Sequence, residues 1–315
     1  MPMIETVNLT KKYGEFVALD NLNLTIEEGT CFGFIGPNGA GKTTTIKILA
    51  TLLKPTWGEA RIDGKVVGYQ NHLIRPLIGY VPDFMGAYQD MTVGEYLEFF
   101  AACYAVPAGR REKTIAEVLA LTDLSHKTET EVNGLSRGMQ QRLAVARVLI
   151  HDPKVLLMDE PSSGLDPRAR IEMRELLKEL RRIGKTILIS SHILYELADL
   201  CNAVGVVEQG KLVFAGAVSD LMQRAKVGKV VQIQVEARTE DAAQLLRAVR
   251  GVAKVDIMVE EGGRRLDVQL APDADIAASE LAARLLAQGF RLSRLQPEEI
   301  SLETAFMRLT KGLVS

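Results

Sequence analysis

The chain carries a glycine-rich stretch whose residue types and spacing suit the binding of a nucleoside triphosphate. Residues 36–43 match the pattern G-x-x-x-x-G-K followed by Ser or Thr, and they lie between a strand-like run and a helical pattern. Backbone N–H groups of such a loop cradle phosphate oxygens, Lys42 reaches the terminal phosphates, and Thr43 is placed to bind Mg²⁺. The predicted nucleotide-binding residues here are Gly36, Pro37, Asn38, Gly39, Ala40, Gly41, Lys42, Thr43 and Thr44.

Two adjacent carboxylates, Asp159 and Glu160, directly follow the apolar run 155–158. Such a short run is typical of a buried parallel strand. An acidic pair at a strand end is by itself most often a surface feature, whereas beside an intact phosphate loop it indicates catalysis. We predict that Asp159 is a Mg²⁺ ligand. Glu160 is predicted to be the general base, because a carboxylate within hydrogen-bond reach can polarise the attacking water.

A histidine follows the next apolar strand pattern, which covers residues 186–190. His192 therefore lies at a strand end near the expected phosphates, where a group that positions the attacking water belongs. A lone histidine is more often an ordinary polar residue, and we interpret His72, His126 and His151 in that way. His192 is the second predicted catalytic residue.

A second candidate phosphate-binding element is the segment 135–142, with the sequence LSRGMQQR. It combines a small hydroxyl residue and a glycine with the start of an apolar-periodic helix. The free N–H groups and positive dipole end of a helix N-terminus form a ready anion site. Gly138 would let a ligand approach the backbone closely. Ser136 and Gly138 are therefore predicted to bind phosphate.

Taken in order, the phosphate loop, residues 135–142 and the acidic pair resemble the ATPases of the ATP-binding cassette (ABC) family. The resemblance covers residues 3 to about 220. It implies that the bound nucleotide is ATP and that residues 135–142 are the family's signature motif. In that family the signature binds the γ-phosphate of ATP held by the second subunit of a dimer, so each chain contributes half of two sites.

The resemblance implies roles for three further residues. Tyr13 corresponds to the aromatic residue that stacks on adenine, and His192 to the histidine that contacts the γ-phosphate. Asp166 ends a segment, 163–166, that resembles the D-loop at the dimer interface. Asp166 is equally suited to cap the helix that begins at Pro167, and the two roles are compatible.

Three positions depart from the family's usual pattern. Arg137 and Met139 stand where the signature usually has glycine and glutamine. Asp83 stands where the family usually has a glutamine that touches Mg²⁺ or water and links the site to the membrane subunit. A carboxylate can also ligate Mg²⁺, so Asp83 is the third predicted metal-binding residue, with Thr43 and Asp159.

The elements that must position these residues alternate between short apolar runs and helical patterns, which is typical of an α/β fold with a mostly parallel sheet. The strand-rich segment 1–35 adds an antiparallel β part. Helical patterns dominate from about residue 92 to 150, where Thr92 and Glu95 have the spacing of a capping box. We predict a P-loop NTPase fold of the ABC cassette type over residues 1–223, with a helical subdomain at about 92–150.

The pattern changes after about residue 221, where apolar and polar residues alternate with period two. Strand and helix patterns then follow in the order β-α-β-β-α-β, which predicts a ferredoxin-like split βαβ unit. We predict a small α+β accessory domain at 224–315 that closes with a helix at 302–309. Its strand patterns cover residues 231–235, 255–259, 266–270 and 290–295, and its other helical patterns cover 240–249 and 276–288.

Composition limits the classes of partner. The net charge is −2 and the pI is about 6.2, which argues against a basic surface for nucleic acid. No apolar run approaches the roughly 18 residues of a membrane-spanning helix, and no signal peptide is evident. The scattered residues Cys31, Cys103 and Cys201 indicate reduced thiols. We expect a cytoplasmic protein, peripheral on the inner face of the cell membrane, with transmembrane permease subunits and a second ATPase subunit, identical or different, as partners.

The segments around Asp83, Arg137 and the C-terminal domain look most like ATPase subunits of ABC-2 type exporters, a class that includes multidrug and gliding-motility systems. ATP hydrolysis that powers export is therefore the leading hypothesis. DNA-maintenance ATPases are excluded because no coiled coil separates Lys42 from Ser136. Two-cassette translation factors are excluded because the chain has one phosphate loop. An importer ATPase with a regulatory C-terminal domain stays an alternative.

Overall fold

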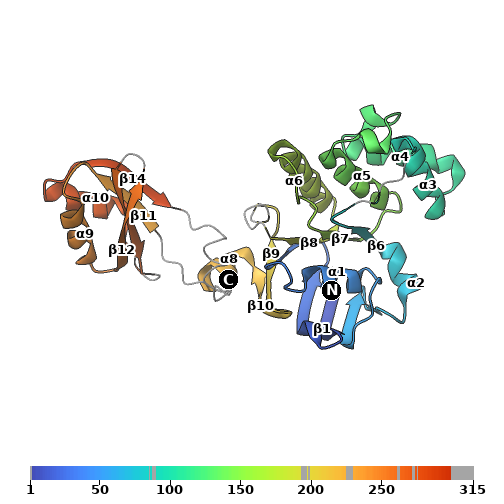
Figure 1. Cartoon of the computed structure of the whole chain (residues 1–315), viewed down its shortest axis with the longest axis horizontal. Helices are drawn as coiled ribbons and strands as arrows, with labels where there is room; N and C mark the ends of the chain where they lie inside the picture. Colours follow the sequence, from blue (N-terminus) through green and yellow to red (C-terminus); the bar gives the residue numbers. More distant parts are fainter. Residues whose placement is uncertain are drawn as a thin grey trace. The chain divides into compact units, whose positions relative to one another are not determined.

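The computed structural model divides the chain into two compact units, 1–218 and 219–315 (Figure 1). The sequence placed the division a few residues later, at 223/224, and the predicted helix at 302–309 lies outside the described residues. In the part that is described, no helix is both long and apolar enough to cross a membrane. The structure describes residues 2–84, 86, 90–192, 197, 199–224, 230–260, 263–271, 274 and 276–298.

The first unit contains an antiparallel sheet with the strand order β2-β1-β4-β5. β1 and β2 form a long hairpin, and β4 and β5 are joined by the tight turn at Asp63-Gly64. One face of this sheet packs on helix α1 (Lys42–Leu49) and on the central sheet through a common apolar core. The strands are β1 (Pro2–Tyr13), β2 (Phe16–Glu27), β4 (Trp57–Ile62) and β5 (Lys65–Val66).

The central sheet has six strands in the order β10-β9-β3-β8-β7-β6. Pairing is parallel except between β9 and β10, and every residue of β3, β7 and β8 is buried. Because both faces are covered, these strands are continuous apolar runs, as the sequence indicated. The strands are β3 (Cys31–Ile35), β6 (Ile78–Val81), β7 (Val155–Asp159), β8 (Thr186–Ser191), β9 (Ala203–Glu208) and β10 (Lys211–Ala217).

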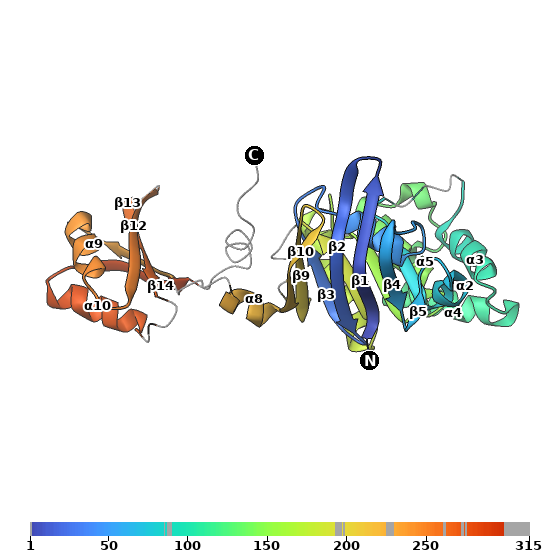
Figure 2. The same ribbon diagram turned by 90° about the horizontal axis from the view of Figure 1, so that it is seen from below.

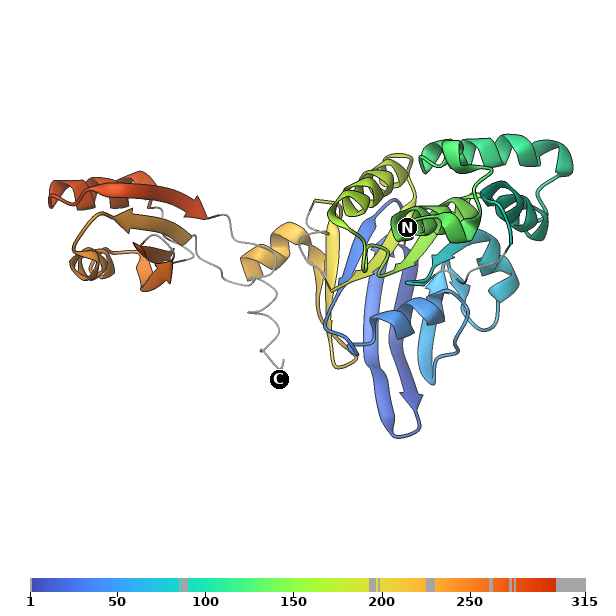
Figure 3. The same cartoon turned by 45° about the horizontal axis from the view of Figure 1, so that its top comes forward.

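Helices α5 (Arg137–Leu149) and α6 (Pro167–Arg182) cover the face of the central sheet opposite the antiparallel sheet (Figure 3). The helical subdomain also contains α3 (Val93–Cys103) and α4 (Ala108–Leu121). The predicted capping box is present, since Thr92 and Glu95 each bind the other's backbone N–H. The short helices of this unit are α2 (Asn71–Ile74), η1 (Arg75–Leu77), η2 (Ser125–Lys127) and η3 (Val132–Gly134).

The second unit is an antiparallel sheet in the order β12-β13-β11-β14, with helices α9 and α10 on one face (Figure 2). In β11, Val231, Ile233 and Val235 are turned to the core, and Gln232 and Gln234 are half-buried. The element order is β-α-β-β-α-β, as the period-two patterns predict. The elements are α8 (Val218–Arg224), β11 (Val230–Val235), α9 (Thr239–Arg247), β12 (Val252–Glu260), β13 (Gly263–Leu270), α10 (Ala278–Ala287) and β14 (Leu292–Glu298).

A candidate ATP-binding and hydrolysis site

The phosphate loop links β3 to α1 and packs tightly on the main chain beside it. Gly41 has φ +106°, and a Cβ there would lie 2.7 Å from the carbonyl oxygen of Ala18. A Cβ on Gly36 would lie 2.3 Å from the carbonyl oxygen of Val207. Glycine at both positions therefore has a steric cause. The loop ends at the N-terminus of α1, so its N–H groups and the helix dipole suit phosphate.

Lys42 is almost fully buried, and its side chain turns back over the loop. Its Nζ donates to the carbonyl oxygens of Gly36, at 2.6 Å, and Pro37, at 3.2 Å. The same ammonium lies 3.5 Å from Oε1 of Glu160. The loop thus contacts the acidic pair through its lysine.

Thr43 and Asp159 meet as the sequence predicted. Thr43 Oγ1 donates to Asp159 Oδ1 at 3.0 Å. Asp159 is the last residue of β7 and is 4% exposed. A hydroxyl and a carboxylate so close together are hard oxygen donors of the kind Mg²⁺ prefers. The residues present therefore fit a Mg²⁺ ion bound to ATP, and Thr43 and Asp159 would hold it.

Negative charge accumulates at this edge of the sheet. The pKa of Tyr80 on β6 is raised to about 12, chiefly by burial and further by the charges of Asp159 and Asp83. A divalent cation would offset these carboxylates and the phosphates. Asp83 lines the same cleft as the phosphate loop, although its predicted role as a metal ligand stays a prediction.

Glu160 and His192 form a direct pair. Nδ1 of His192 lies 2.7 Å from Oε2 of Glu160. An ionised carboxylate only accepts, so the histidine donates through Nδ1 and keeps Nε2 for another group. Glu160 has φ +51°, a left-handed conformation that a glutamate adopts at a free-energy cost. Such strain is frequently found at functional sites.

An exposed aromatic pair closes one side of the cleft in front of the phosphate loop. The cleft has a volume of about 320 Å³ and is lined by residues 38–44, Asp83, Glu160 and the aromatic residues Tyr13 and Phe16. Tyr13 ends β1 and Phe16 begins β2, so both rings come from one hairpin end. An aromatic ring beside a phosphate loop can stack on a base. The sequence singled out Tyr13 and missed Phe16, although Phe16 lies only three positions further along.

Residues of the signature do not belong to this cleft. Of the described residues that line it, none comes from 135–142. Ser136 caps α5 by accepting from the N–H of Met139 at 3.3 Å. A Cβ on Gly138 would lie 2.5 Å from Cβ of Ala169 on α6, so the close packing of two helices requires this glycine within one chain. The sequence explained Gly138 only by ligand approach.

Asp166 likewise has an evident role within its own chain. Its Oδ1 accepts from the N–H of Ala169 at 2.9 Å, which caps α6 with Pro167 at the first position. The preceding Gly164 has φ +66°, and a Cβ there would meet the guanidinium of Arg137 at 2.7 Å. The D-loop segment is therefore packed against the signature segment.

Two of the three departures from the family pattern, Arg137 and Asp83, lie together. Nη2 of Arg137 is 3.8 Å from Oδ1 of Asp83, and both side chains are about half exposed. Neither residue alone indicated this pairing in the sequence. The geometry shows that the extra positive charge and the extra negative charge are neighbours in one chain.

Comparison with known proteins agrees with this arrangement. The family described as ABC transporter matches residues 19–163. A Bacillus subtilis linearmycin resistance ATP-binding protein is 32% identical over 309 residues, which cover 98% of this chain and 98% of the relative. A Nod factor export ATP-binding protein of Ralstonia nicotianae is 35% identical over 309 residues, covering 98% of this chain and 94% of the relative.

The chain belongs to the ATP-binding proteins of ABC transporters. It is an ATPase, and its first unit is an ABC cassette. A solved dimeric cassette, in a post-hydrolysis state bound to ADP and Pi, is 30% identical to it, with a TM-score of 0.61. The match covers 68% of this chain and 98% of the solved chain. The family resemblance and the predicted cassette fold are thus confirmed.

Proposed function

We propose that the chain is the ATP-hydrolysing subunit of an exporter and that it acts through separate membrane-spanning permease subunits. The names of the relatives support export, since one is a linearmycin resistance protein and the other a Nod factor export protein. We place the chain at the cytoplasmic face of the cell membrane, bound to those permeases. The solved dimeric cassette supports a second ATPase subunit as a partner.

We assign the chemistry to the cluster that joins three elements. Lys42 binds the terminal phosphates, while Thr43 and Asp159 hold Mg²⁺, which offsets the charge that develops on the transferred phosphoryl group. Glu160 accepts a hydrogen bond from the attacking water and polarises it. His192 orients Glu160 through Nδ1 and offers Nε2 to the γ-phosphate. Tyr13, with Phe16, stacks on adenine.

We assign Ser136 and Gly138 to the ATP held by the second subunit. The observation that supports this most is that α5 presents its capped N-terminus outside the cleft of its own chain. Asp166, at the packed D-loop segment, would lie at the same subunit interface. Two copies would then enclose two ATP molecules.

The observation that carries the proposed hydrolysis is the contact of Glu160 with both Lys42 and His192. This contact supports the assignment, because it holds a carboxylate beside the lysine to which we assign phosphate binding.

The test is purification from membranes through a tag on this chain, under mild detergent. We expect an integral membrane protein to co-purify, and ATP hydrolysis by the complex to be lost in the Glu160→Gln variant. An active chain that never associates with a membrane protein would contradict the transport role.

A further inference from the structure

Ser190 is a buried hydroxyl at the centre of the catalytic cluster. It lies near the carboxyl end of β8 and is fully buried. In the parallel sheet it is in register with Asp159 on β7 and with Phe34 on β3. The strand that carries it is thus flanked by the strand of the acidic pair and the strand that leads into the phosphate loop.

The Ser190 hydroxyl makes two hydrogen bonds to two consecutive residues. It donates to Oδ1 of Asp159 at 2.7 Å, and it accepts from the N–H of Glu160 at 3.0 Å. A serine hydroxyl has one proton to donate and can accept as well, so a single side chain satisfies both bonds. Ser190 therefore fixes the carboxylate of one residue and the main chain of the next.

The bond to Asp159 restricts which carboxylate oxygen stays available. Thr43 also donates to Oδ1, at 3.0 Å. Within the described residues Oδ2 accepts no hydrogen bond, so the two hydroxyls together orient it for another ligand. Partners of this kind, one bond beyond a metal ligand, generally tune metal affinity.

The bond to the Glu160 N–H acts at a strained position. With φ +51°, Glu160 leaves the extended path of β7, and its side chain reaches both His192 and Lys42. A left-handed glutamate persists only where its surroundings hold it. The acceptor that holds this turn at its N–H is the Ser190 hydroxyl.

We propose that Ser190 is a positioning residue for ATP hydrolysis, which sets the Asp159 carboxylate toward the metal and the Glu160 side chain toward the water. This inference rests on the proposed roles of Asp159 and Glu160. Ser190 is fully buried, and its hydroxyl bonds to Asp159 and Glu160. Its effect passes through the two carboxylates.

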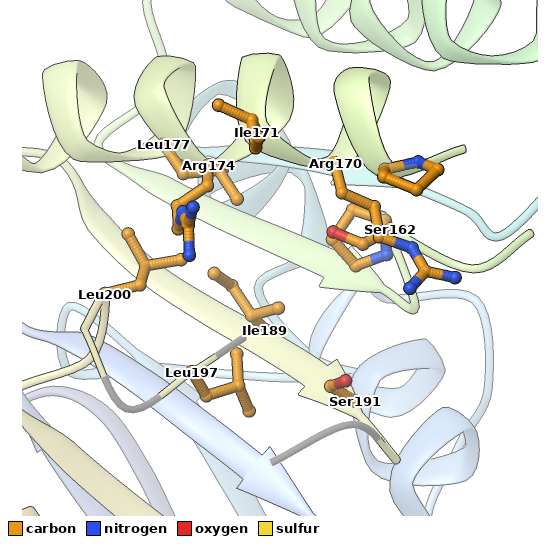
Figure 4. Close-up of a pocket in the computed structure, with 11 residues that line it drawn as sticks. Ser162, Arg170, Ile171, Arg174, Leu177, Ile189, Ser191, Leu197 and Leu200 are labelled. Carbon is orange, nitrogen blue, oxygen red and sulfur yellow. The ribbon is translucent and has the colours of Figure 1, made fainter. Parts of the chain in front are cut away.

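The neighbouring serine provides a matched control. Successive residues of a strand point to opposite faces of a sheet. Ser191 lines a cavity of about 260 Å³ between α6 and β8, which Figure 4 shows with Arg170 and Leu197 around it. Ser191→Ala removes the same hydroxyl from the same strand, on the face of the sheet opposite Ser190.

The experiment compares Ser190→Ala, Ser190→Thr, Ser190→Val and Ser191→Ala in the full-length chain. Threonine and valine have nearly the same shape, so this pair differs at Ser190 mainly by the hydroxyl. Two quantities are measured: kcat and KM for ATP, and the affinity for Mn²⁺ in the presence of ADP, followed by the EPR signal of free Mn²⁺. The second readout requires no turnover.

We expect Ser190→Ala and Ser190→Val to lower kcat by about 10- to 100-fold with little change in KM. Mn²⁺ affinity should fall about 10-fold or more. Ser190→Thr should restore both quantities to within a few-fold of wild type, and Ser191→Ala should leave both near wild type.

Three results would overturn the inference: folded Ser190→Ala with wild-type kcat and Mn²⁺ affinity, equal behaviour of the threonine and valine variants, or recovery of folded protein only with threonine. The last would make the hydroxyl a folding requirement. Asp159→Asn and Glu160→Gln, run in parallel, test the underlying roles. If Asp159→Asn keeps Mn²⁺ affinity or Glu160→Gln keeps hydrolysis, the proposed function itself fails.

Discussion

The cassette has two regions that differ in where their polar groups form hydrogen bonds and ion pairs. We call the region around the phosphate loop and Glu160 the phosphate-loop side, and the region around residues 135–142 the signature side. On the first side, the Glu160 carboxylate lies within 3.5 Å of both Lys42 and His192. The Asp159 carboxylate accepts from Thr43 at 3.0 Å and from Ser190 at 2.7 Å. On the second side, Ser136 bonds to its own helix.

This difference is what we expect of a chain that contributes half of a site formed with a second copy. The cluster around Glu160 is assembled by folding alone, because parallel strands bring their carboxyl ends to one edge. The signature helix is fixed just as firmly, by Gly138 against α6 and by Arg142, whose guanidinium lies 3.2 Å from Glu172. It does not line its own chain's cleft, which fits our proposal that a second copy supplies it.

The largest effect is expected from a substitution on the phosphate-loop side. Glu160→Gln removes the acceptor for the attacking water while it keeps size and most packing. We predict that hydrolysis falls about 10²-fold or more, whereas ATP binding persists and an ATP-dependent dimer accumulates in size-exclusion chromatography. Glu175→Gln, on the exposed face of α6, is the control. Wild-type hydrolysis in the Glu160 variant would remove the base from this account.

A smaller effect is expected at the aromatic edge of the same side. Tyr13→Ala and Phe16→Ala each remove a ring from the cleft, and we predict a loss of about 1–3 kcal/mol in ATP binding for a ring that stacks on the base. Titration with a fluorescent ATP measures it. Trp57→Ala is the control, because the Trp57 ring is also about half exposed but does not line the cleft. Equal losses in all three variants would show a general effect on the antiparallel sheet.

A still smaller effect is expected where the two sides meet. The Arg137–Asp83 pair is half exposed and 3.8 Å long, so its coupling free energy should stay below about 1 kcal/mol and weaken with salt. A double-mutant cycle with Asp83→Ala and Arg137→Ala, read as kcat/KM, measures it. If Asp83→Ala alone abolishes ATP binding, Asp83 is a primary nucleotide ligand and the pair is incidental.

The smallest effect is expected from the second unit. Every residue predicted to bind phosphate precedes the division at 218/219, so a chain cut after Arg224 should bind ATP with wild-type affinity. Isothermal titration measures this, with circular dichroism as the control for folding. A folded, monodisperse truncation that no longer binds ATP would show that the two units depend on each other.

Much of the first unit could be predicted because its signals are local. The glycine spacing of 36–43 and the apolar runs that end at Asp159 and Ser191 each specify a loop or a buried strand within a few residues. Since parallel strands share an edge, the meeting of Thr43 with Asp159 and of Glu160 with His192 follows from these local signals.

The features that could not be predicted from the sequence depend on contacts between elements that are far apart along the chain. Ser190 and Ser191 are identical in type, and only the register of β8 with β7 decides which one meets Asp159. The pairing of Arg137 with Asp83 joins segments more than 50 positions apart, as their numbers show. Gly138 does indicate a close approach to the backbone, but the group that approaches it within the chain is Ala169 on α6.

The most direct test of a shared site is complementation between two inactive chains. Lys42→Ala inactivates the phosphate-loop side, and Ser136→Arg blocks the signature side. Each variant alone should be inactive. In a 1:1 mixture half of the randomly paired dimers carry one intact site, so we predict recovery of up to about a quarter of the wild-type rate. Mixed dimers that form but show no activity, or full activity of Ser136→Arg alone, would contradict the account.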